Sequence, residues 1–71
     1  MISAQEIVEK FGVPYHTVNY YTVIGLLPVV SRKGNQRLYD AQEIKHRLEA
    51  ISKLSSEGYP LNLIRKKLVG I

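Results

Sequence analysis

The amino-acid sequence predicts a mainly α-helical domain of about four helices with a small two-stranded β-hairpin. Three observations support this fold class. Apolar residues recur at helical spacing in each helical segment, a serine, an aspartate or a proline precedes each segment, and a Gly-Asn pair separates two short strand-like runs near the middle of the chain. With 71 residues the chain forms one domain, residues 1–71. A domain this small buries only about 60% of its unfolded surface, so its stability depends on a thin apolar core.

The first two predicted helices form a helix-turn-helix arrangement. The first begins at Ser3, because Ser3 and Glu6 have the spacing of a capping box, and it ends at Gly12. Pro14 is accepted in the first turn of the second helix, which we expect to run to about Val23. Two helices joined by a short turn within the first two dozen residues are typical of this arrangement. The outer face of the second helix is polar and aromatic but nearly uncharged, and it carries Tyr15, His16, Asn19 and Tyr20.

A basic hairpin follows. We expect one strand at Val29 to Ser31, its antiparallel partner at Gln36 to Tyr39, and a tip at Lys33 to Asn35. Because two strands alone are marginal in water, the hairpin must pack on the helices, and Leu38 is the expected anchor. Its cations have no acidic neighbour between them, which predicts an uncompensated positive loop made of Arg32, Lys33 and Arg37.

Two helices complete the predicted domain. Asp40 opens the third helix in a second capping box, and the helix runs to about Ser56. Within it, Lys45 and Arg47 alternate with glutamates, which is typical of a solvated face. The last helix begins after Pro60, and its inward-facing residues are expected to be Leu61, Ile64 and Leu68.

Composition limits the classes of function. The net charge of +4 and a pI near 9.6 favour nucleic acid or an anionic surface as partner. The chain has no cysteine, and His16 and His46 are its only histidines, so we expect no disulfide, no metal site and no cofactor. No apolar stretch approaches the roughly 20 residues of a membrane span, and no signal peptide is evident. We therefore expect a cytoplasmic protein without membrane contact.

Three segments carry a recognisable pattern in the same order: the segment from Gly12 to Pro28, which holds the tyrosine pair and the Gly-Leu-Leu turn, the hairpin residues Gly34, Arg37 and Tyr39, and the later turn from Glu57 to Leu61. With these segments the sequence strongly resembles, over nearly the whole chain, the DNA-binding domain of MerR-family transcription regulators, which are bacterial-type regulators. The resemblance implies a winged helix-turn-helix that binds double-stranded DNA, with the second helix in the major groove and the wing on the adjacent backbone.

The chain departs from the family pattern in two respects. Asn19 replaces the arginine before the tyrosine pair, Thr22 replaces the glutamate after it, and Pro14 replaces the serine that opens the helix. Family members also continue into a long dimerisation helix and an effector-binding domain, which this sequence lacks. It is therefore either a fragment of a longer regulator or a short stand-alone relative, and any dimer would form through parts absent here.

The predicted DNA contacts fall into two groups. Tyr15, His16 and Asn19 are the candidates for reading base edges, since asparagine can pair bidentately with adenine in the major groove. The alternative for Asn19 is a surface position or a phosphate contact. Arg37 is the main candidate for a phosphate contact, because its forked donors match phosphate oxygens, and Tyr20 is a second candidate.

The remaining candidates have equally good structural explanations. Arg32 and Lys33 either contact phosphates or are merely solvated. Tyr39 either offers its hydroxyl to the DNA backbone or packs beneath the wing. Thr17 either contacts DNA or only satisfies the helix backbone. Contacts to phosphate set position and affinity but carry no direct sequence information.

Three classes of binding function remain, and an enzyme is not among them. A sequence-specific regulator is the leading hypothesis, and an excisionase-like architectural DNA-binding protein is the alternative. A protein-interaction module built on the same fold is the third. The sequence contains no paired carboxylates, no metal-ligand spacing, no phosphate-cradling glycine loop and no serine with an evident partner base.

Overall fold

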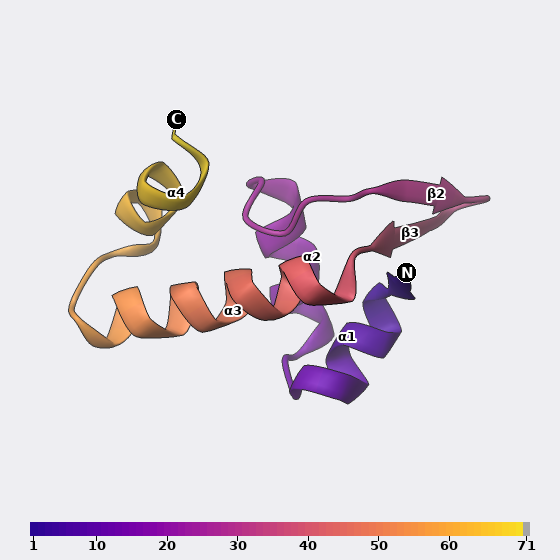
Figure 1. Cartoon of the computed structure of the whole chain (residues 1–71), viewed down its shortest axis with the longest axis horizontal. Helices are drawn as coiled ribbons and strands as arrows, with labels where there is room; N and C mark the ends of the chain where they lie inside the picture. The colour runs from indigo at the N-terminus through magenta and orange to yellow at the C-terminus, as the bar shows by residue number, and fades with distance from the viewer. Residues whose placement is uncertain (71) are drawn as a thin grey trace.

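The computed structural model describes residues 1–70 and contains, in this range, four helices and one three-stranded antiparallel sheet (Figure 1). The predicted fold class is confirmed. The elements are β1 (Ile2–Ser3), α1 (Ala4–Phe11), α2 (Tyr15–Val23), β2 (Ser31–Lys33), β3 (Gln36–Tyr39), α3 (Ala41–Ser56) and α4 (Leu61–Val69). None of these helices is long and apolar enough to cross a bilayer.

The sheet has one strand more than the predicted hairpin. The strand order is β1-β3-β2, so β3 is central and β1 pairs with it through Ile2 opposite Tyr39 and Ser3 opposite Leu38. A strand of two residues is too short to show alternation, which is why the sequence does not predict it. The sequence predicts the first hairpin strand at Val29 to Ser31, whereas β2 spans Ser31–Lys33; the Val30 amide, just before it, donates to the Leu38 carbonyl at 2.9 Å. Because β1 pairs with β3, the N-terminus holds the base of the wing, which is the hairpin formed by β2 and β3.

The helix boundaries follow local chemistry. The capping box at α1 is complete, since the Ser3 hydroxyl accepts from the Glu6 amide at 3.2 Å and the Glu6 carboxylate accepts from the Ser3 amide at 2.9 Å. Gly12 ends α1 with a φ of 69°, a conformation that side chains oppose. Asp40 caps α3 by accepting from the amides of Gln42 and Glu43.

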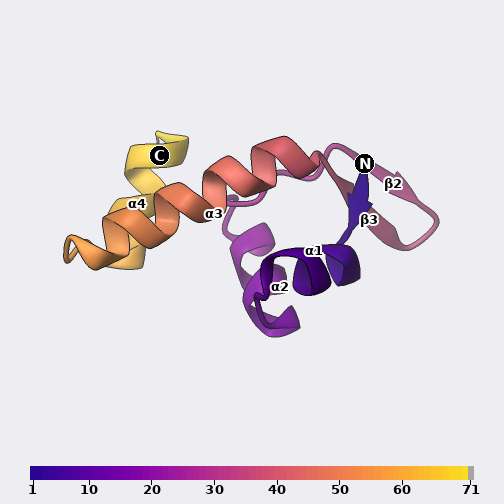
Figure 2. The same ribbon diagram turned by 60° about the horizontal axis from the view of Figure 1, so that its bottom comes forward.

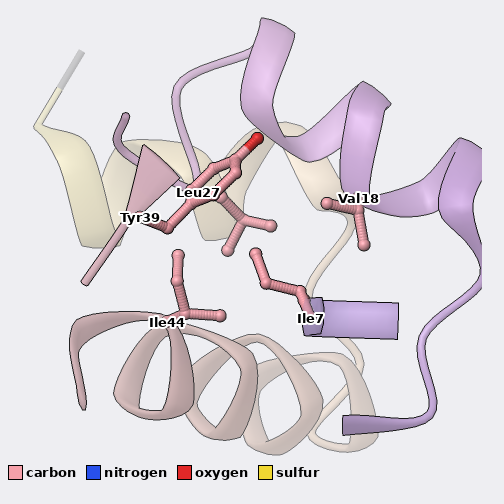
Figure 3. Packing of buried hydrophobic residues seen from close by; sticks show 5 residues of the cluster. All are labelled: Ile7, Val18, Leu27, Tyr39 and Ile44. Carbon is pink, nitrogen blue, oxygen red and sulfur yellow. The ribbon is translucent and has the colours of Figure 1, made fainter. Parts of the chain in front are cut away.

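The main apolar core joins α1, α2, β3 and α3. Its fully buried side chains converge in Figure 3, and they are Ile7, Val18, Leu27, Tyr39 and Ile44. Tyr39 anchors the wing in place of Leu38, which is only half-buried. Because successive strand residues point to opposite faces, burying one of these neighbours turns the other away from the core.

A second core joins α4 to the rest of the domain. Leu26, Ile51 and Ile64 form it, and Tyr21 packs against both cores. Two arginines reinforce this junction by donating to carbonyls just after α2: Arg47 Nη1 lies 3.1 Å from the Leu26 oxygen, and Arg65 Nε lies 2.7 Å from the Ile24 oxygen. The prediction of a solvated face at Arg47 is therefore wrong for this residue, since its head group contacts the turn after α2.

The wing and α4 lie at opposite ends of α3 in both views (Figure 1, Figure 2). The helix-turn-helix lies toward the wing end of α3, whereas α4 packs on the other half of α3. Surface variants on α4 are therefore suitable controls for a function placed at the wing.

Candidate nucleic-acid interface

The helix α2 separates its buried and exposed residues cleanly. Val18 is fully buried, whereas Tyr15 and Tyr20 are 57% and 54% exposed, and His16 and Asn19 are also exposed. The exposed residues recur at intervals of about four, which places them along one face of the helix. This face is the outer face that the sequence predicts.

The wing presents two arginines side by side. Arg32 on β2 lies directly opposite Arg37 on β3, and paired residues of neighbouring strands point to the same face of a sheet. Like charges in this arrangement are destabilising unless an opposite charge lies nearby. The pair therefore marks a place where an anion would be stabilised.

One shallow hollow of about 350 Å³ lies between the wing and the start of α2. Its lining combines Tyr15 and Asn19 of α2 with Arg32 and Arg37 of the wing, and no carboxylate is among its lining residues in the described part of the chain. The remaining lining residues come from the start of the chain and from the wing tip: Ser3, Ala4, Gln5, Asn35 and Gln36. α2 and the wing thus border a single basic surface.

A direct hydrogen bond joins the two elements. Arg37 Nη1 donates to the Asn19 side-chain oxygen at 2.8 Å, across 18 positions of sequence. A guanidinium has only donors, so the oxygen and not the nitrogen of the Asn19 amide must face it. The predicted base reader and the predicted phosphate ligand therefore contact each other.

The family model described as a MerR HTH family regulatory protein matches residues 2–70. The chain belongs to this family. It is 36% identical over 67 residues to a mercuric resistance operon regulatory protein of Bacillus cereus, which corresponds to 93% of this chain and 49% of that protein. The chain thus spans about half the length of this curated relative. No solved structure matches the chain.

Thr22, which stands where the MerR pattern has a glutamate, is the partner of Tyr39. The two side-chain oxygens lie 2.8 Å apart, and Thr22 Oγ1 also donates to the Val18 carbonyl at 2.7 Å. Because a hydroxyl has one proton, Tyr39 must donate to Thr22. Tyr39 is 0% exposed, so its position favours packing beneath the wing over the predicted contact with DNA.

Four other predicted residues lie outside the hollow, and Tyr20, which is exposed on α2, is one of them. Thr17 is half-buried and borders a different groove, between the helix-turn-helix and α3–α4, so the structure does not bring it together with Asn19. His16 is exposed on α2, and Lys33 is exposed at the end of β2, next to the wing tip.

Sequence reasoning missed the contribution of the first residues. Ser3, Ala4 and Gln5 reach the hollow because β1 pairs with β3, and this pairing left no pattern in the sequence. Asn35 and Gln36 were predicted as part of the hairpin but not as part of a site. The position of Asn35 at the turn was the available signal, since a wing tip is the part of a hairpin that projects furthest.

Proposed function

We propose that this domain binds double-stranded DNA sequence-specifically, as the DNA-binding domain of a MerR-like transcription regulator in the cytoplasm. In this arrangement α2 enters the major groove and the wing contacts the adjacent phosphate backbone. The observation that carries the proposal is that the outer face of α2 and the wing arginines border the same basic hollow and are joined by the hydrogen bond between Asn19 and Arg37.

The shape of the surface suits duplex DNA. A helix with its side chains is about 10–12 Å wide, which matches a major groove about 12 Å wide. With α2 in the groove, Tyr15 and His16 face base edges, and Arg32 and Arg37 lie where the flanking strand carries its phosphates. Tyr20 and Lys33 extend the contact on either side. The cations set affinity and register, and the residues on α2 supply the preference for sequence.

Selection of bound duplexes from a random pool tests this proposal. We expect an enriched motif, and a two-fold symmetric motif would indicate that two copies bind together. In a complete regulator we expect dimerisation through segments outside this sequence. Recovery of no motif, combined with bending of random duplexes by several adjacent copies, would favour the architectural alternative and contradict the proposal.

A further inference from the structure

We propose that Asn19 and Arg37 act as one composite phosphate clamp, and that Asn19 orients Arg37 instead of reading adenine. This inference rests on the proposed function, since the phosphate belongs to the bound duplex. It gives Asn19, a residue of α2, a role in the phosphate contact that the wing makes. The observation behind it is the 2.8 Å hydrogen bond between Arg37 Nη1 and the Asn19 oxygen.

The chemistry of the amide argues against adenine. Bidentate recognition of adenine uses the asparagine oxygen to accept from N6 and the asparagine nitrogen to donate to N7. In Asn19 the oxygen already accepts from Arg37, which uses one of its two lone pairs and leaves the two N–H donors of the amide available. These donors fit an acceptor such as a phosphate oxygen.

The wing supplies the second half of the clamp. A guanidinium has five N–H donors, and the bond to Asn19 uses one on Nη1, which leaves the others available to a phosphate. Arg32 stands opposite Arg37 on the same face of the sheet. No carboxylate among the described lining residues neutralises the two cations, so a phosphate supplies the missing opposite charge.

The position of Asn19 is where the MerR pattern has arginine. An arginine here would place a further cation beside Arg37 and could not accept its hydrogen bond. The exchange to asparagine therefore converts a repulsive neighbour into an acceptor that fixes the Arg37 head group. Fixing a flexible side chain before binding reduces the entropy lost when the complex forms.

A double-mutant cycle tests the clamp. The full chain is prepared as wild type, Asn19→Ala, Arg37→Ala and the double variant, and each binds one selected duplex and one random duplex over a range of salt concentrations. We expect Asn19→Ala to weaken both duplexes by the same factor, within about twofold. We expect the fold-loss of affinity in the double variant to be smaller than the product of the two single fold-losses by a factor of at least about three, because the two residues act together.

Two further variants sharpen the test. Asn19→Asp places a carboxylate against Arg37, so it should weaken binding more than Asn19→Ala on both duplexes. Asn62→Ala makes the same change at an exposed position of α4, away from the wing, and should leave binding unchanged. Asn19 is exposed, and unfolding temperatures near that of the wild type will show that each variant folds.

The outcomes separate the clamp from the function it rests on. The clamp is overturned if Asn19→Ala leaves both affinities unchanged, or if it relaxes preference at one base pair while the single losses multiply in the double variant. In either case the proposed function stands. If Arg37→Ala changes neither affinity nor salt dependence, the phosphate contact of the wing is itself wrong, and the proposed function is contradicted together with the clamp.

Discussion

Removing the hydroxyl of Tyr39 distinguishes its structural role from a contact with DNA. In Tyr39→Phe the ring remains in the core with Ile7 and Leu27, so no large cavity forms. The change removes one buried hydrogen bond, the donation from Tyr39 to Thr22 at 2.8 Å. Thr22 keeps its own bond to the Val18 carbonyl, so the hydroxyl of Thr22 is not left without a partner.

The expected loss of stability follows from this single bond. One such bond contributes about 1 kcal/mol net to the free energy of unfolding. For a domain of about 60–100 residues, a loss of about 1 kcal/mol lowers the unfolding temperature by roughly 4–8 °C. Affinity for DNA, measured well below that temperature, should change by less than about twofold, because the hydroxyl lies beneath the surface.

Tyr20→Phe is the matched control. It removes the same hydroxyl from a ring that is 54% exposed, and no residue of the described chain forms a hydrogen bond with it. We expect an unchanged unfolding temperature and weaker binding on all duplexes. Thermal unfolding followed by circular dichroism and fluorescence anisotropy with a labelled duplex measure the two quantities. If Tyr39→Phe kept its stability and lost affinity as Tyr20→Phe does, the assignment of Tyr39 to the core would be refuted.

Three other variants test separate parts of the account. Arg37→Ala should weaken binding similarly on all sequences and reduce the slope of log affinity against log salt by about one unit. Lys53→Ala on α3 is the control and should change neither the affinity nor this slope. Equal slopes for the two variants would contradict a phosphate contact. Arg65→Met removes a charged donor from the carbonyl after α2 and should cost about 1.5 kcal/mol in urea unfolding, and an unchanged midpoint would show that this bond contributes nothing. Hydrogen bonds from the backbone of Ser3, and then from its hydroxyl, lower the pKa of Glu6 below its ordinary 4.5. The resulting stabilisation is present above pH 4.5 and is lost as the pH falls through the lower pKa of the folded state. Glu6→Gln should therefore flatten the decline of unfolding free energy on the acid side, and identical pH profiles of stability for the variant and the wild type would contradict this.

Local signals in the sequence predicted the elements well. Ser3, Gly12 and Asp40 act through residues within four positions of themselves, and the structure places a cap at each, although at Asp40 it shows the aspartate half of the predicted capping box. The exposed face of α2 followed from helical spacing around Val18 for the same reason. The local pattern was not sufficient for every boundary, since it predicts the first hairpin strand at Val29 to Ser31 and β2 spans Ser31–Lys33.

Features that depend on how elements meet were not predictable. Whether Leu38 or Tyr39 anchors the wing depends on which face of β3 meets the helices, and a strand of four residues does not decide this. Arg47 serves a carbonyl on another element, which no pattern within α3 indicates. The bond between Asn19 and Arg37 arises because the wing packs beside α2, so sequence reasoning identified both residues and missed their contact.

The central claim is that α2 and the wing grip one duplex together. Titration of the ¹⁵N-labelled chain with a selected duplex, followed by amide chemical shifts, tests it most directly. We predict the largest shifts at Tyr15 to Tyr20 and at Ser31 to Arg37, with α4 unaffected. Shifts confined to α3 and α4, with α2 and the wing unchanged, would contradict the account.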